Sequence, residues 1–427
     1  MGQKKWGPLN DPIALAAGQA KSLNNRPWFI PAIESMRGIA ALTVSLAHVY
    51  GYWLVNRLPP SVATEFWNEH AFANAVRRVL FGAGASAVTL FFVISGFVLL
   101  ISLQRAAEKP TLGAALQFGV SRIFRIYPAL VVVILAWAVT EPWFLFGSTS
   151  YRPLSEVVRN LSLFDATMDL PTWSTRVEIA ATPVLFLAWL IRLRWRERGL
   201  LAVIIALALC GLASSLYAED MIGRYIFCFA LGAILPDVAS IFARLPRSCA
   251  LGLLAAAVMT AIAARPFIFA SFHSQYAIWV EAGCYAIVVG LIVYADLPAV
   301  RRFLELSLCR WFGRISYSYY LIHFMILLIL LRRVPDWLIS AMTGNNYFVG
   351  AMLVFVAVFC LTTALSIAMY GFIERPLVAV GRRLSASAAL TQLQDRRGNP
   401  HAAIGRGYGC FFNSVQDATR PSSPACR

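Results

Sequence analysis

Residues 83–103, AGASAVTLFFVISGFVLLISL, contain no charged side chain. A transmembrane α-helix needs ~20 mostly apolar residues to cross ~30 Å of hydrocarbon. The stretch therefore predicts a helix that spans a membrane, and similar stretches recur along the chain.

The composition of the whole chain indicates the same fold class. Of the 427 residues, 59% are hydrophobic and 14% are charged, whereas soluble domains are ~45–50% apolar and ~25% charged. The sequence therefore predicts an all-α polytopic membrane protein. The eight cysteines include no C-x-x-C pair and most lie within apolar stretches, so they predict neither a disulfide framework nor a metal site.

Ten apolar stretches predict ten membrane-spanning helices. They are residues 38–55, 83–103, 127–146, 177–193, 199–217, 221–241, 248–264, 276–295, 311–333 and 348–373. The fourth and the seventh are short, and Glu141-Pro142 interrupts the third. We predict a cytoplasmic N-terminal extension (1–32), a transmembrane domain (33–378) and a polar, disordered cytoplasmic tail (379–427).

The distribution of basic residues predicts the orientation of this bundle. With ten helices, the N-terminal segment, the even-numbered loops and the C-terminal tail carry 27 of the 37 Lys and Arg residues, and the odd-numbered loops carry 10. Because cytoplasmic loops hold the excess of Lys and Arg, both termini are predicted in the cytoplasm. The same rule accounts for the net charge of +16, so no nucleic-acid partner is predicted.

The first predicted helix carries an ionisable side chain near its middle. His48 lies eleven residues after Arg37, a rise of ~16 Å at ~1.5 Å per residue. Arg37 is therefore predicted at the cytoplasmic edge and His48 near the membrane centre. A histidine at that depth faces a partner, a cavity or a substrate. It could bond to a neighbouring helix, or act as a general base, because neutral imidazole accepts a hydroxyl proton at neutral pH.

Two further motifs lie in the second helix and just before the third. Ser95-Gly96 interrupts a bulky apolar row, where small residues allow either close helix packing or room for a substrate. Arg122 and Arg125 are three residues apart and could clamp an anion together from one helix face. Ordinary cytoplasmic charge explains the two arginines equally well.

A carboxylate is predicted at the outer end of the fourth helix. Glu178 follows Trp173 and Ser174 in the stretch PTWSTRVE. The helix dipole favours a carboxylate near a helix N-terminus. Alternatively, Glu178 could orient an imidazole or hold an acceptor hydroxyl.

The ninth predicted helix has a polar entrance, GRISYSYYLIH, at residues 313–323. Arg314 lies at its cytoplasmic edge and His323 nine residues deeper. Hydroxyl groups between them, including that of Tyr317, could stabilise an oxyanion. The tenth helix ends in IERP, which contains Glu374.

Six motifs in this order resemble the membrane-bound acyltransferases that modify cell-surface glycans, the acyltransferase type 3 family. The motifs are RGIAALTVSLAH, LFFVISGFVL, RIFRIYP, PTWSTRVE, GRISYSYYLIH and IERP, and they cover roughly residues 33–378. The resemblance implies a bundle of about ten helices. It also implies transfer of an acyl group, commonly acetyl, from cytoplasmic coenzyme A to a hydroxyl of a glycan. After Glu178 the family often has further polar or aromatic residues, whereas Ile179-Ala180-Ala181 follows here.

The resemblance assigns roles to the residues singled out above. The catalytic residues would be His48 and Glu178. Phosphates of acetyl-CoA, or of another acyl-CoA, would bind to Arg37, Arg122, Arg125 and Arg314, because arginine makes planar, multidentate phosphate contacts. The substrate or the oxyanion would contact Ser95, Trp173, Ser174, Tyr317 and His323. The expected partners are a glycan or glycolipid acceptor and the lipid bilayer, with no metal ion.

Two other function classes fit parts of the pattern. A transporter or flippase also places ionisable residues at mid-membrane depth, although no duplicated halves are evident. A non-catalytic partner in glycan assembly is the third interpretation. The thirty-three arginines and four lysines are typical of GC-rich bacterial coding, so the predicted location is the inner membrane of a bacterium. The acceptor stays open among lipopolysaccharide, exopolysaccharide and other glycans.

Overall fold

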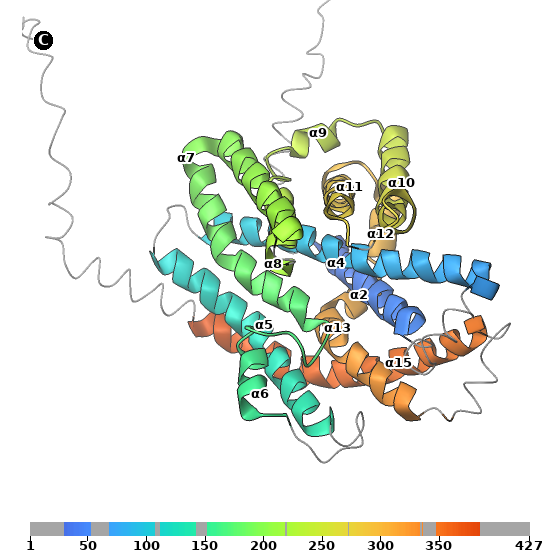
Figure 1. Ribbon diagram of the computed structural model, residues 1–427. Helices are drawn as coiled ribbons and strands as arrows, with labels where there is room; N and C mark the ends of the chain where they lie inside the picture. The colour runs from blue at the N-terminus through green and yellow to red at the C-terminus, as the bar shows by residue number, and fades with distance from the viewer. Residues whose placement is uncertain are drawn as a thin grey trace, which may run out of the picture.

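The computed structural model is all-α over the residues that it describes, which are 30–52, 68–106, 112–141, 152–217, 220–271, 273–333, 335 and 347–384. Its α-helices are α2 (Pro31–Tyr52), α4 (Ala71–Ala106), α5 (Leu112–Thr140), α6 (Leu154–Leu161), α7 (Thr172–Tyr217), α8 (Met221–Ala233), α9 (Ala239–Ala243), α10 (Arg247–Ala263), α11 (Gln275–Tyr294), α12 (Pro298–Leu304), α13 (Ser307–Arg333) and α15 (Tyr347–Met369) (Figure 1). Two π-helical turns, η2 (Ala264–Ile268) and η4 (Tyr370–Glu374), extend α10 and α15. Most of the predicted N-terminal extension and C-terminal tail lies outside the described residues.

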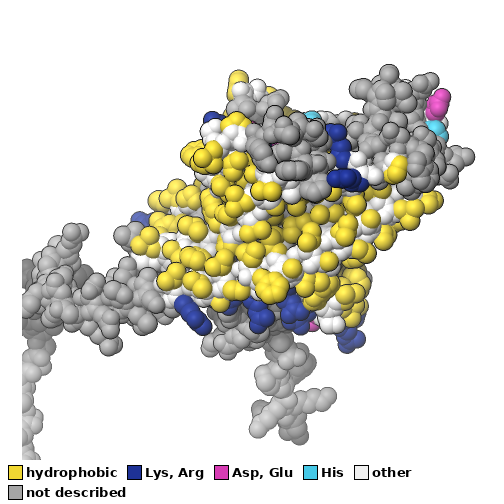
Figure 2. All heavy atoms as spheres, turned by 90° about the horizontal axis from the view of Figure 1, so that it is seen from below, with side chains coloured by type: hydrophobic (Ala, Val, Ile, Leu, Met, Phe, Trp, Pro, Cys, Tyr) yellow, Lys and Arg dark blue, Asp and Glu magenta, His cyan; other side chains and the backbone are white. Residues whose placement is uncertain are grey.

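Seven of the described helices are long and apolar enough to cross a membrane: α4, α5, α7, α10 with η2, α11, α13, and α15 with its continuation. Figure 2 shows hydrophobic side chains over most of the face in view, with Lys and Arg side chains along its borders. The chain is therefore a multi-pass membrane protein. Each of the ten predicted spans overlaps a helix. The number of ten and the cytoplasmic position of the termini stay predictions.

Helix α7 contains two of the predicted spans. It is 46 residues long and is broken at Arg196, whose φ of 51° and ψ of −139° are not helical. In Figure 1 the chain turns back on itself within α7. The two halves rise ~36 Å and ~31 Å at ~1.5 Å per residue, and each is long enough for ~30 Å of hydrocarbon. The predicted helices 177–193 and 199–217 are thus the two arms of one hairpin.

This hairpin gives a direct test of the topology. We expect reporter fusions after Phe164, Glu197 and Ala218 to report the outer side, the cytoplasm and the outer side, because the basic turn at Arg196 belongs in the cytoplasm. Paired alkaline phosphatase and fluorescent-protein fusions would measure this. If all three fusions report one side, α7 does not cross the membrane twice and the orientation must be revised.

Helix α5 begins fifteen residues before the predicted start of the third span. Arg122 and Arg125 therefore lie well inside a helix and not in the loop before it, which corrects their predicted place. Glu141, the polar residue that interrupts the predicted third span, directly follows the last residue of α5. Its carboxylate accepts hydrogen bonds of 2.6 and 2.5 Å from Nε and Nη2 of Arg152, so the ion pair satisfies the buried acid.

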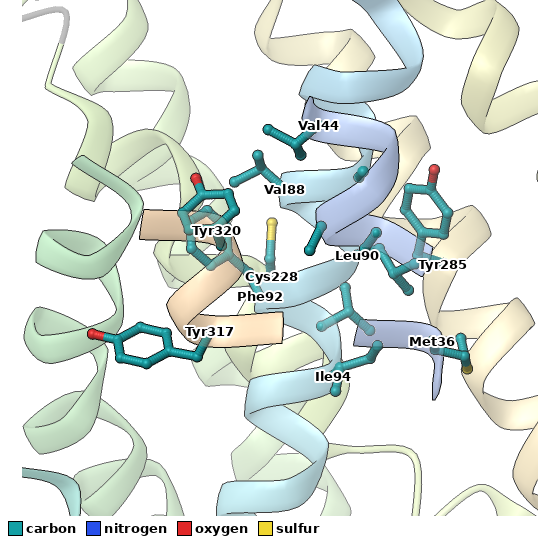
Figure 3. Close-up of a cluster of buried hydrophobic side chains, with 14 of the residues drawn as sticks. Met36, Val44, Val88, Leu90, Phe92, Ile94, Cys228, Tyr285, Tyr317 and Tyr320 are labelled. Carbon is teal, nitrogen blue, oxygen red and sulfur yellow. The ribbon is translucent and has the colours of Figure 1, made fainter. Parts of the chain in front are cut away.

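Helix α4 lies at the centre of the bundle and contacts α2, α7, α8, α10 and α11. Figure 3 shows side chains from α2, α4, α8, α11 and α13 meeting in one apolar cluster. A Cβ atom at Gly96 would overlap the backbone of Phe229 in α8. Gly96 therefore serves close helix packing, which is one of the two alternatives that the sequence left open.

Helices α2 and α13 run side by side and in the same direction. A Cβ atom at Gly38 would lie 3.0 Å from the backbone nitrogen of Gly313, so the two backbones touch there. Further along both helices, the hydroxyl of Tyr319 donates to Oγ of Ser45 at 3.1 Å. From the first contact to the second, the residue numbers increase along both helices, so the two helices are parallel. Their C-terminal halves carry His48 and His323.

Candidate active site

A cavity opens between α2, α4, α7 and α13. Five of its lining residues were predicted from sequence to be functional; these are Arg37, Ser95, Ser174, Glu178 and Tyr317. The others are Phe91, Phe92, Thr175, Ser316 and Tyr320. Helix packing thus brings together side chains that are up to 283 residues apart in the sequence.

One wall of the cavity holds a carboxylate paired with an arginine. Glu178 forms an ion pair with Nη2 of Arg122 and accepts a hydrogen bond of 3.4 Å from Oγ of Ser95. The side chain of Glu178 is only 17% exposed and that of Arg122 only 14%, so the ion pair is largely shielded from solvent. The sequence placed these two groups on opposite sides of the membrane. The structure corrects this, because the early start of α5 places Arg122 at the depth of Glu178.

The second arginine of the pair has a different partner. Nη1 of Arg125 lies 3.2 Å from Oε2 of Glu374, and the guanidinium lies over the ring of Tyr317 at 5.8 Å from its centroid. Glu374 is buried and also accepts a hydrogen bond from Ser318. The hydroxyl of Tyr317 donates to the carbonyl of Ile126 at 2.9 Å, so that proton is already committed within the protein.

The arginines predicted to bind the acyl donor differ in their hydrogen-bond partners and in their exposure. Nε of Arg37 and Nε of Arg122 are buried and have no hydrogen-bond partner among the described residues. Buried guanidinium donors without partners are suited to an anionic ligand. Arg314 is exposed and outside the cavity lining, close enough to interact electrostatically with Glu34.

The two intramembrane histidines form a pair. Nδ1 of His48 lies 2.8 Å from Nε2 of His323, and the ring planes are within 8° of parallel. His323 is fully buried and His48 is partly buried. The sequence treated them as separate candidates, whereas the structure joins them by a hydrogen bond. Neither is among the residues that line the cavity.

Tyr320 lies between the cavity and the histidine pair. Its ring packs on His323 with 5.8 Å between centroids and on Phe91 with 5.5 Å. Its hydroxyl accepts a hydrogen bond of 2.9 Å from Ser174. The predicted Trp173 packs against the rings of Phe92 and Tyr225 and is not among the residues that line the cavity.

The segment before α7 holds a buried acid that the sequence did not single out. Asp169 is fully buried, and burial raises its pKa well above the usual range. Its backbone carbonyl accepts hydrogen bonds from the amide and the hydroxyl of Thr172 at the start of α7. No local pattern marks Asp169 in the sequence, because its burial depends on how this segment packs under α5 and α13.

The chemistry that this arrangement allows is acid–base catalysis beside a cavity with buried guanidinium groups. The described residues contain no group of three metal-ligating side chains suited to a metal ion. A hydrogen-bonded imidazole pair can take up and return a proton, and buried guanidinium groups can hold phosphate.

Comparison with known proteins identifies the family. A family model described as an acyltransferase domain matches residues 30–371, which include every residue that the sequence predicted to be functional. No curated protein and no solved structure matches the chain. The matched range covers most of the 427 residues and the helices that form the cavity. The chain therefore belongs to the acyltransferase type 3 family and is a membrane acyltransferase.

Proposed function

We propose that the protein transfers an acetyl group, or another acyl group, from cytoplasmic acyl-CoA to a hydroxyl of a cell-surface glycan or glycolipid. The proposed location is the inner membrane of a bacterium. The observation that carries the proposal is the cavity lined by Arg37 and Glu178, with Arg122 paired to Glu178 behind it. Nε of Arg37 and Nε of Arg122 are buried there and have no hydrogen-bond partner among the described residues.

The separation of the arginines from His48 favours a donor with a long arm. Arg37 and His48 are eleven residues apart on α2, which is ~16 Å along the helix axis. A ligand that binds by phosphate at Arg37 can deliver an acyl group to His48 only if a long linker joins the two. Coenzyme A has such a linker, the pantetheine arm, between its phosphates and its thioester.

The proposed step uses His48 as the general base. The glycan hydroxyl loses its proton to His48, and its oxygen forms a bond to the thioester carbonyl carbon. The carbon–sulfur bond then breaks, and the leaving thiolate receives the proton from His48. Atoms and charges balance, and the step requires no covalent intermediate on the enzyme.

Purified protein in lipid nanodiscs provides the test. With radiolabelled acetyl-CoA and a glycan extract from the host cell, we expect label in the glycan and release of free coenzyme A. Mass spectrometry of surface glycans from a deletion strain and its complemented parent would identify the acceptor. If the protein binds neither acyl-CoA nor free coenzyme A, the proposal is wrong. Glycan movement without coenzyme A release would favour a transporter.

A second test concerns the donor site. Arg37→Ala and Arg122→Ala should each weaken acyl-CoA binding by roughly 10- to 150-fold, because a charge-assisted hydrogen bond contributes ~1.5–3 kcal/mol. Lysine at either position should recover part of the loss, since it restores the charge without the planar fork. Isothermal titration with a non-hydrolysable acyl-CoA would measure the affinities.

Arg192→Ala is the matched control. Arg192 is also partly buried and paired with a carboxylate, that of Asp237. Neither Arg192 nor Asp237 lines the cavity, whereas Arg37 and Glu178, the partner of Arg122, both do. We expect the Arg192→Ala protein to bind the donor as tightly as the wild type does. Equal weakening by all three substitutions would mean that the effect comes from general loss of structure and not from phosphate contacts.

A further inference from the structure

The hydrogen-bonding direction within the histidine pair can be derived from its surroundings. Nδ1 of His323 lies 2.6 Å from the backbone carbonyl oxygen of Tyr320. A carbonyl oxygen only accepts hydrogen bonds. Nδ1 of His323 must therefore carry a proton and donate it to Tyr320.

This fixes the tautomer of both rings when they are neutral. A neutral imidazole has one N–H, so Nε2 of His323 is an acceptor. The 2.8 Å contact to that nitrogen then requires an N–H at Nδ1 of His48. The lone pair of His48 consequently lies on Nε2, the nitrogen on the opposite side of its ring from His323.

We infer that His323 is a positioning residue that holds His48 in the tautomer with its basic lone pair on Nε2. The inference rests on the proposed function, in which Nε2 of His48 takes the proton of the acceptor hydroxyl. It assigns His323 to the orientation of the base and not to contact with the substrate or the oxyanion.

The packing around His323 supports a fixed ring. His323 is 0% exposed. Its ring is within 3° of parallel to the ring of Tyr319, with 6.2 Å between centroids. Tyr319 is itself held by its hydrogen bond to Ser45 of α2, and the carbonyl that His323 binds belongs to its own helix. The ring of His323 therefore cannot rotate without breaking contacts on two sides.

The hydrogen bond between His48 and His323, together with that from His323 to Tyr320, forms a hydrogen-bond relay. This relay also has a role during the reaction. When Nε2 of His48 receives the proton, the ring becomes an imidazolium that donates from both nitrogens. Nε2 of His323 accepts the hydrogen bond from Nδ1 of this imidazolium and so stabilises the charge. The orienting acid of a hydrolase triad acts in the same way, but here the orienting group is a neutral ring. The proton on Nε2 then passes to the leaving thiolate.

Nitrogen NMR of protein with ¹⁵N-labelled histidine tests the tautomer without any assay of activity. Nitrogens with and without a proton have well-separated ¹⁵N shifts, and the chain has only five histidines. His48 can be assigned from the signals lost in His48→Gln. We expect a protonated Nδ1 and an unprotonated Nε2 at His48 in the wild type, and a mixture of both tautomers in His323→Leu.

Two substitutions of His323 separate hydrogen bonding from packing. His323→Leu keeps much of the volume and removes the acceptor, so kcat should fall by roughly 10- to 100-fold, as for loss of the groups that orient metal-binding imidazoles. KM for acyl-CoA should stay within about twofold, since the donor site is separate from the histidine pair. His323→Gln places an amide oxygen near the former Nε2 and should restore most of kcat. His273→Leu, at an exposed histidine far along the chain, is the control.

Three results would overturn the inference. One is a wild-type His48 with the proton on Nε2 or with both tautomers populated. Another is an unchanged tautomer in His323→Leu. The third is an equal loss of kcat in His323→Leu and His323→Gln with folding intact. A protein that shows the expected tautomers but transfers no acyl group would refute the proposed function and leave the hydrogen-bond relay in place.

Discussion

Replacement of His48 by alanine should lower acyl transfer by about 10²–10⁴-fold, which is the usual contribution of a positioned general base. The protein should still insert and fold, because alanine is well tolerated in the middle of a helix. His48→Gln should be nearly as slow, since the amide forms hydrogen bonds but accepts no proton at neutral pH. Release of free coenzyme A from acetyl-CoA in the presence of glycan acceptor measures the rate.

The control for this experiment follows from the structure. His323 lies at a depth similar to that of His48, but His323→Ala is not a suitable control. His323 is hydrogen-bonded to His48, so its loss should also slow the reaction. His273 is exposed, so His273→Ala is the better control. Near-normal transfer by well-expressed His48→Ala protein would exclude His48 as the base.

Replacement of Glu281 by alanine should cost about 3–5 kcal/mol of stability, the range for removing one partner of a buried ion pair. Glu281 is 0% exposed. It accepts hydrogen bonds from Arg265 at 2.6 and 2.8 Å and from Thr89 at 2.9 Å. The substitution leaves the charge of Arg265 buried without its carboxylate. Thermal unfolding in detergent should show a large fall in the transition temperature.

Two comparisons test whether the uncompensated charge is the cause. The double variant Arg265→Met/Glu281→Leu removes both charges and should regain much of the loss. Arg159 forms an ion pair with Asp165 on an exposed segment, and Arg159→Ala should leave the transition temperature unchanged, because exposed pairs contribute little. If the double variant is less stable than Glu281→Ala, the charge argument is wrong and the packing of these side chains dominates.

Hydropathy located the helices well and the site residues in part. Each apolar stretch overlaps a helix because one property, the length of the apolar run, decides whether a segment spans hydrocarbon. The predicted sixth span, 221–241, is wrong as a single helix, because α8 ends at Ala233 and a turn separates it from α9. Helix ends were less accurate. The predicted third span omitted the first half of α5, since its polar residues, among them Arg122 and Arg125, face protein partners there and not water.

The partners within the site could not be read from the sequence. Arg122 pairs with Glu178, Arg125 with Glu374 and His48 with His323, and each pair joins distant helices. Spacing along one helix predicts which side chains share a face, but not which face of another helix lies opposite. Arg265 shows the same limit. It was counted as a basic residue of an outer loop, yet the structure buries it against Glu281.

The parallel alignment of α2 and α13 has a consequence for the number of membrane crossings. Two parallel helices in one bilayer must be separated by an odd number of crossings, because each crossing reverses the direction of the chain. With the predicted spans, α4, α5, the two arms of α7, α10 and α11 supply six such crossings. The parallel alignment then predicts that the short helix α8 crosses as well, although its 13 residues rise only ~20 Å. A helix that short crosses only where the hydrocarbon is thin or its ends are covered by protein, so we expect the bundle to deform the bilayer or to replace it around α8.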